Sequence, residues 1–284
     1  MTRLTTNLSS ESWYFGHVPP QPFTAEDIYD LSAVDIWLPA TIPGNVRTDL
    51  LSLELIPEPF IDEGYKNSLW VENVDWWYKC ELTHQQIEAS QQAYLMFAGI
   101  DYLSAIFING QEQSRHEGMF SRQIIDLTKF LQQSEVITIA VRIWGSEALP
   151  TRQLNWLQTI WQAFASKIYT SWVGIYPDRT ATLKSQMSFG WDFAPPIRTM
   201  GIWDEAQLIV TEGPAIIEAS VIGIPQAKNE NVNITIPLTV ACQQPAKAKV
   251  QVEITPANFE ATLSSNLVWD LRSALRTVKQ HSQS

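Results

Sequence analysis

The chain has 284 residues, of which 45% are hydrophobic and 17% charged, so it can bury a sizeable core in one large or two medium domains. A formal net charge of −11 excludes nucleic acid and anionic membrane surfaces as expected partners, because both require basic side chains. Two cysteines and four scattered histidines predict no disulfide framework, no metal site and no other cofactor.

The cysteines and the N-terminus bear on the compartment. Cys80 and Cys242 are far apart in the sequence, and we expect two free thiols buried on strands in a reducing environment. The first 17 residues contain no apolar leader segment, and no run of about 18 apolar residues could span a bilayer. These features predict a cytoplasmic protein.

The N-terminal part predicts one strand and one short helix. Residues 1–10 are polar and are expected to be loose. From Trp13 to Val18, apolar residues alternate with smaller or polar ones, as in a half-buried strand, and the prolines at 19, 20 and 22 end it. Asn45 is a candidate N-cap for a helix over Val46 to Leu53, which must end before Pro57.

The middle of the chain has the pattern of short strands. Asn109 and Gly110 form the strongest hairpin signal in the sequence. Strands at roughly 8–15-residue spacing are typical of a β-sandwich or jelly roll. They are predicted at Trp76 to Leu82, Ala93 to Ala98, Tyr102 to Ile108, Arg122 to Leu127 and Glu135 to Trp144.

Residues 146–180 interrupt this pattern. Apolar residues from Leu154 to Ile168 recur at helical spacing, which indicates a helix packed on the sandwich rather than a cofactor site. Strands are then predicted at Leu183 to Phe189 and at Ala206 to Val210.

A domain boundary is predicted near Gly213 and Pro214, so that the domains are residues 1–213 and 214–284. The second domain begins like an immunoglobulin-like sandwich, but that fold needs about 100 residues and about seven strands. Its tail, Leu267 to Gln280, has the pattern of a helix. We therefore expect the second domain to be incomplete. Its predicted strands are Ile216 to Ile224, Val232 to Cys242 and Ala248 to Ile254.

The stretch from Phe189 to Trp203 holds the strongest candidate site. It combines Trp191 and Asp192 with a double proline, whose rings prevent a regular helix or central strand from continuing. A carboxylate can accept hydrogen bonds from sugar hydroxyls, and an aromatic face can cover a sugar ring. On chemistry alone the alternative stays open that the tryptophans belong to a core and that Asp192 caps a turn.

Several motifs of this chain resemble, in the same order, the N-terminal domain of β-mannosidases of glycoside hydrolase family 2. The loop motif is FGWD, then PP, then GIW, between Phe189 and Trp203. The other motifs are PATIPGNVRTDLL with IPEPF from Pro39 to Phe60, WVENVDWWYKCEL from Trp70, FAGIDYLSAIFING from Phe97 and EGMF ending at Phe120. The resemblance covers roughly residues 10–212.

The resemblance implies a mainly β protein: a jelly-roll β-sandwich of the galactose-binding type, followed by the incomplete immunoglobulin-like sandwich. It also implies that Asp192 binds hydroxyls of a terminal mannose and that Trp191 orients the loop or lines the pocket. The family commonly has tryptophan and glycine where this chain has Phe193 and Ala194, which puts the path of the loop in doubt. Asp204 stands where the family usually has an arginine, so the resemblance implies that a family ion pair is missing here.

No catalytic residue is expected among the 284 residues. In this family both catalytic glutamates lie on a (β/α)₈ barrel, which takes about 250 residues and follows the immunoglobulin-like domain. Asn229-Glu230 superficially matches the family's acid/base motif, but it lies in a polar stretch between two predicted strands, and we interpret it as a solvated turn.

Three hypotheses on function follow. The first is the N-terminal region of a β-mannosidase, truncated before the barrel, inactive alone and at most a weak sugar binder. Its partners are a β-mannoside or manno-oligosaccharide substrate and a separate or downstream barrel. The second is a stand-alone carbohydrate-binding module. The third is a degenerate structural or interaction remnant, whose exposed apolar faces self-associate.

Overall fold

The computed structural model describes residues 3–26, 28–85, 87–151, 156–157, 178–191, 193–225, 232–241, 249–252 and 267–270. The chain divides into two compact units. The sandwich unit comprises Leu4–Ala89 and Ala93–Val210, and the C-terminal unit comprises Met1–Arg3, Ser90–Gln92 and Thr211–Ser284.

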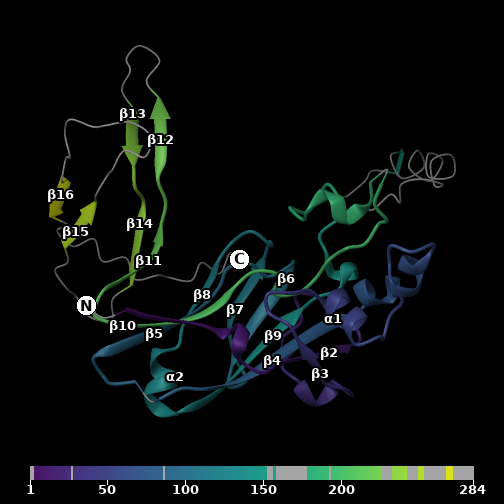
Figure 1. Ribbon diagram of the computed structural model, residues 1–284, viewed down its shortest axis with the longest axis horizontal. Coiled ribbons are helices and arrows are strands. Elements are labelled where there is room, and N and C mark those ends of the chain that lie inside the picture. Colours follow the sequence, from purple (N-terminus) through teal and green to yellow (C-terminus); the bar gives the residue numbers. More distant parts are fainter. Residues whose placement is uncertain are drawn as a thin grey trace. The chain divides into compact units, whose positions relative to one another are not determined.

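The sandwich unit is built on two β-sheets (Figure 1). The six-stranded sheet has the order β3 (Leu38–Ala40), β2 (Trp13–Val18), β4 (Asp75–Thr83), β9 (Val136–Ile143), β6 (Leu103–Ile108) and β7 (Gln111–Glu117). The four-stranded sheet has the order β1 (Arg3–Asn7), β10 (Ala206–Glu212), β5 (Gln91–Phe97) and β8 (Gln123–Asp126). The mainly β fold is confirmed.

Helices are short and connect the strands. Asn45 caps α1 (Val46–Ser52): its Oδ1 accepts a hydrogen bond of 3.1 Å from the Thr48 backbone N–H, as the sequence predicts. A second α-helix among the described residues is α2 (Thr128–Gln133), and residues 156–157 are helical as well. The 3-10 helices are η1 (Leu8–Ser10), η2 (Leu31–Ala33), η3 (Gly64–Asn73), η4 (Ser146–Ala148) and η5 (Gln186–Phe189).

Strand β4 is buried on both faces and holds two of the 12 tryptophans, Trp76 and Trp77. Trp76 and Tyr78 join the main core with side chains from both sheets, including Leu95 of β5. Trp77 points to the other face, where it packs with Phe107 in a second apolar cluster. The segment before β3 contributes side chains to that cluster. These tryptophans are structural, because burial leaves them no contact with solvent.

Most predicted strands of the sandwich unit are confirmed, and two expectations are wrong. Residues 3–7 form β1 beside β10 instead of a loose end, because their backbone completes the edge of the four-stranded sheet. Residues 183–185 are irregular, with a bend at Lys184, and residues 186–189 form η5, so the predicted strand is wrong. The Lys184 side chain is buried there in an ion pair with Asp101. A solvent-exposed edge strand would not bring this side chain to Asp101.

In the C-terminal unit the described residues form three antiparallel pairs. These are β11 (Ala215–Ala219) with β14 (Leu238–Ala241), β12 (Ile222–Pro225) with β13 (Val232–Thr235), and β15 (Lys249–Val252) with β16 (Leu267–Asp270). The expected helix from Leu267 is wrong for its first four residues, because they pair with β15; residues 271–280 lie outside the described part.

Two of the expected single strands of this unit are each divided in two. Pro237 lies between β13 and β14, and a proline cannot donate a hydrogen bond to the sheet. In the described part of the chain no helix has the length and apolar character needed to cross a membrane.

Candidate functional site

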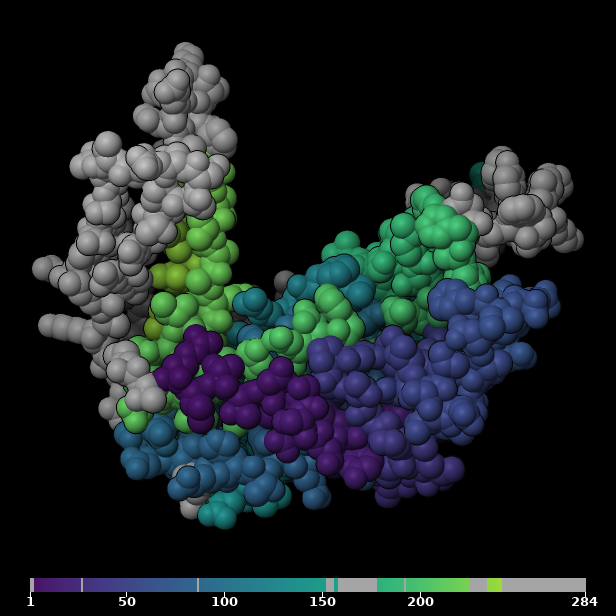
Figure 2. All heavy atoms as spheres, viewed as in Figure 1, coloured from purple at the N-terminus to yellow at the C-terminus, as the bar shows by residue number. Residues whose placement is uncertain are grey.

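The candidate site is a loop of the sandwich unit that we call the 178–204 loop. Its first leg, residues 178–189, leads to the tip and lies at the surface in the space-filling view (Figure 2). Its returning leg, residues 195–204, leads back to the sandwich. Near its tip, Gly190 has a φ of 91°, which favours glycine. Trp191 and Ala194 then exchange two backbone hydrogen bonds of 3.0 and 3.2 Å and so close a tight turn. Trp191 is 45% exposed and Phe193 is 78% exposed. Asp192 lies outside the described residues.

An inner set of buried polar contacts closes the base of the loop. The Asp101 carboxylate, between β5 and β6, forms an ion pair with Lys184 of the first leg. Its other oxygen accepts a hydrogen bond of 2.7 Å from Thr199 Oγ1 of the returning leg. Lys184 Nζ also donates to the Thr199 carbonyl over 2.7 Å. We call Asp101, Lys184 and Thr199 the inner clamp.

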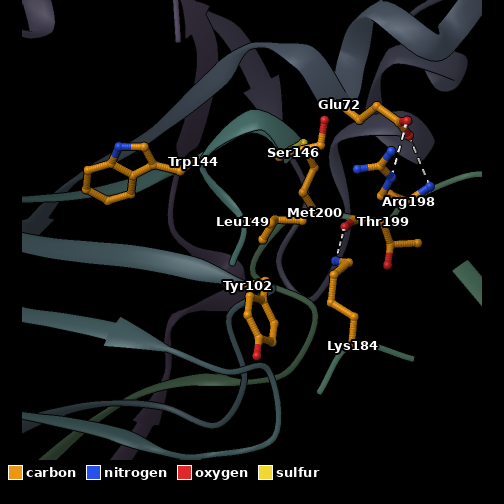
Figure 3. A pocket seen from close by; sticks show the side chains of 9 residues that line it. All are labelled: Glu72, Tyr102, Trp144, Ser146, Leu149, Lys184, Arg198, Thr199 and Met200. Carbon is orange, nitrogen blue, oxygen red and sulfur yellow. Dashed lines mark hydrogen bonds and ion pairs between the residues drawn. The ribbon is translucent and has the colours of Figure 1, made fainter. Parts of the chain in front are cut away.

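An outer set of ion pairs lies beside the inner clamp. Arg198 pairs with Glu72 of η3 (Nε to Oε1, 3.5 Å) and with Asp178 at the start of the loop (Nη1 to Oδ2, 3.2 Å). Figure 3 shows Glu72 and Arg198 facing each other. Arg47 of α1 pairs with the same Glu72 (Nη2 to Oε2, 3.1 Å) and donates to the Arg198 carbonyl. We call Arg47, Glu72, Asp178 and Arg198 the outer clamp.

The returning leg is held by its backbone as well. Asp101 and Gly201 exchange two backbone hydrogen bonds of 2.9 and 3.2 Å. Gly201 has a φ of 150°, and a Cβ there would lie 2.8 Å from the Cα of Asn45. Trp203 Nε1 donates to the Met119 carbonyl over 2.8 Å. The loop is therefore fixed at its base and exposed at its tip.

Burial determines the electrostatics of the base. Desolvation lowers the pKa of the Lys184 ammonium from its ordinary value, and the Asp101 carboxylate opposes this shift. Desolvation likewise raises the pKa of Tyr102, whose hydroxyl accepts a hydrogen bond of 3.0 Å from the Leu183 N–H. The charges of the base are thus engaged within the protein rather than offered to a ligand.

A small cavity at the base cannot be a sugar site. Its lining includes Glu72, Trp144, Lys184 and Arg198 (Figure 3), and its volume is about 10 Å³. That space is close to the minimum for one water molecule, whereas small-molecule sites measure about 300–1,000 Å³. Among the described residues of this loop, Trp191 and Phe193 at the tip expose aromatic surface.

The sequence singled out the tip and missed the base. It predicted a special role for Trp191, which is indeed exposed, and for Asp192, which the described residues do not include. Asn229-Glu230 and the expected helix, except residues 156–157, also lie outside the described residues. No pattern in the sequence marks Arg47, Glu72 or Asp101 as functional by its chemistry. Each of them lies in one of the quoted stretches that carry the family resemblance.

Comparisons with known proteins agree with the sandwich unit. Residues 22–204 match the family described as "Glycosyl hydrolase 2 galactose-binding domain-like". The β-mannosidase B of Emericella nidulans is 28% identical over 213 residues, which cover 74% of this chain and 23% of that protein. The β-mannosidase B of Aspergillus terreus is 27% identical over 188 residues, with coverages of 65% and 21%. The chain thus spans less than a quarter of either relative.

Solved structures give the same fold. A β-D-mannosidase from Dictyoglomus thermophilum superposes with a TM-score of 0.65 and 25% identity, over 95% of this chain and 30% of that one. A putative β-galactosidase from Bacteroides fragilis superposes with a TM-score of 0.55 over 95% of this chain and 34% of that one. At 15% identity, the second comparison supports the fold alone.

Proposed function

This chain belongs to the glycosyl hydrolase 2 galactose-binding domain-like family, and we propose that it is the N-terminal region of a β-mannosidase-type glycoside hydrolase. The whole enzyme would hydrolyse terminal non-reducing β-D-mannose residues. In it, the tip of the 178–204 loop supplies Asp192 and Trp191 to the mannose pocket. A (β/α)₈ barrel outside these 284 residues supplies the two carboxyl groups, which a retaining glycosidase holds about 5–5.5 Å apart.

The observation that carries this proposal is the contrast between the two ends of the loop. Its base is held by the inner and outer clamps, while Trp191 and Phe193 expose large aromatic faces at the tip. Burying the four ion pairs of the two clamps is costly unless geometry and hydrogen bonds compensate. A loop fixed in this way presents its tip with little loss of conformational entropy on binding, which suits a ligand-binding role.

The expected affinity of the 284-residue chain is low. One hydrogen bond to a charged group contributes about 1.5–3 kcal/mol, and one aromatic contact adds about 0.5–1.5 kcal/mol. A dissociation constant of 1 mM requires about 4.1 kcal/mol, and the entropy lost on association reduces the gain further. We therefore expect millimolar or weaker binding of β-mannosides and no turnover.

The test begins with the DNA that follows the codon for Ser284. We expect it, or an adjacent reading frame, to encode a barrel with two glutamates. The joined product should hydrolyse p-nitrophenyl β-D-mannopyranoside, and Asp192→Ala should lower its kcat/KM by about 10- to 150-fold, which corresponds to 1.5–3 kcal/mol.

Asp204→Ala is the matched control, because Asp204 is an acidic residue of the same loop that lies at its end and bonds to the backbone of Glu205. It should leave kcat/KM within about twofold. Absence of any barrel, together with tight mannoside binding by the 284-residue chain, would instead establish the stand-alone binding module.

A further inference from the structure

The inner clamp joins the two legs of the 178–204 loop through a single carboxylate. Asp101 lies outside the loop, on the connection between β5 and β6, and its side chain is 1% exposed. One oxygen of the Asp101 carboxylate contacts Lys184 on the first leg, and the other contacts Thr199 on the returning leg. The separation of the legs is therefore set where Asp101 meets both.

Lys184 closes the same junction from the other side. Its amine is 2% exposed and contacts both the Asp101 carboxylate and the Thr199 carbonyl. Removal of one partner would leave the other charge buried without compensation, so the junction tolerates few alternative arrangements. At the loop tip, Trp191 and Ala194 close a tight turn of their own, so the junction and this turn are separate sets of contacts.

We propose that Asp101 and Lys184 are positioning residues: their buried ion pair fixes the direction in which the loop presents Trp191 to a mannoside. The inference rests on the proposed function for its ligand, but the positioning itself is independent of any sugar. Neither side chain touches the ligand, because both are enclosed at the base of the loop.

A second ion pair offers a matched control. Arg142 and Asp75 pair over 2.7 Å with side chains 2% and 0% exposed, and join β9 to β4 in the six-stranded sheet. Removing Arg142 therefore removes an equally buried charge, whose hydrogen bonds go to Asp75 and to the Ile28 carbonyl, neither of which belongs to the 178–204 loop. A merely stabilising role of Lys184 predicts the same behaviour for Lys184→Met and Arg142→Met.

The experiment uses the 284-residue chain labelled with 5-fluorotryptophan, which gives one fluorine resonance for each of the 12 tryptophans. Loss of a resonance in Trp191→Phe assigns Trp191. In Lys184→Met we expect this resonance to move toward the value of free 5-fluorotryptophan, and amide exchange in residues 184–199 to accelerate at least about tenfold. The core resonances of Trp13 and Trp76 should stay in place.

Arg142→Met should leave the Trp191 resonance and the exchange of the loop unchanged. Thr199→Val is the milder variant should Lys184→Met fail to fold: it removes one hydrogen bond, keeps the branched shape, and should cause a smaller change in the same direction. An unmoved Trp191 resonance and unchanged loop exchange in the folded variant, or equal changes in Arg142→Met, would overturn the inference.

A titration with methyl β-D-mannopyranoside separates this inference from the proposed function. If the wild-type Trp191 resonance responds to the sugar, the response should weaken at least about fivefold in Lys184→Met, since the tip no longer points in one direction. If the wild type does not respond, the kcat/KM of Asp192→Ala in the joined product decides the proposed function, and the sugar-free spectra still decide whether Asp101 and Lys184 position the tip.

Discussion

Substituting Glu72 with glutamine tests the outer clamp. The Glu72 carboxylate pairs with Arg47 over 3.1 Å and with Arg198 over 3.5 Å, and it accepts the Arg198 backbone N–H over 3.2 Å. Glutamine has nearly the same shape but no charge, and its amide would turn one N–H group toward a guanidinium. Each hydrogen bond to a charged group exceeds a neutral one by about 1–1.5 kcal/mol. Two weakened hydrogen bonds, together with the repulsion between the amide N–H and a guanidinium N–H, should lower the free energy of unfolding by about 2–4 kcal/mol.

For a domain of 150–250 residues, each kcal/mol shifts the melting temperature by about 2–4 °C. Glu72→Gln should therefore lower the melting temperature, followed by circular dichroism, by about 4–16 °C. Glu63→Gln is the matched control, because Glu63 immediately precedes the same 3-10 helix but its ion pair with Lys66 is exposed. Solvent screens such exposed pairs, so they contribute little to stability. A decrease in Glu72→Gln no larger than in Glu63→Gln would refute the reasoning.

Three further predictions concern the scaffold. Gly201→Ala should lower the free energy of unfolding, measured with urea, by about 2–4 kcal/mol, because the new Cβ would lie 2.8 Å from the Cα of Asn45 and the φ of residue 201 is 150°. A decrease below about 0.5 kcal/mol would contradict this prediction. Trp77→Ala, at a fully buried site, should cost about 3–5 kcal/mol in the same assay, and a cost below about 1 kcal/mol would not fit its burial. Burial raises the pKa of the Cys80 thiol to about 12. In a Cys242→Ser background, this thiol should therefore not react with an aromatic disulfide reagent at about pH 8 until the protein unfolds. Stoichiometric reaction in the folded state would contradict the burial of Cys80.

Local signals in the sequence were sufficient for much of the sandwich unit. Asn109 and Gly110 connect β6 to β7 with φ values of 49° and 82°, and Asn45 caps α1, because turn and cap preferences depend on a few neighbouring residues. Pairings between distant segments gave no such signal. Strand β1 contains no strong apolar alternation, and its place beside β10 is decided by a partner about 200 residues away in the sequence.

The candidate site was predictable only in part for the same reason. An exposed tryptophan beside an acidic residue in a proline-rich loop is visible in the sequence at Trp191 and Asp192. The inner clamp joins Asp101 to residues more than 80 positions later, and periodicity carries no information on such a contact. Lys184 in particular has the pattern of a surface strand residue, yet folding buries it.

Titration of the fluorotryptophan-labelled chain with methyl β-D-mannopyranoside, in the wild type and in Asp192→Ala, tests most directly whether the loop tip contributes to a mannose pocket. We expect the wild-type Trp191 resonance to move with a dissociation constant in the millimolar range or weaker, and the Asp192→Ala resonance to stay in place. A response of equal size in both proteins would contradict the proposed role of this loop.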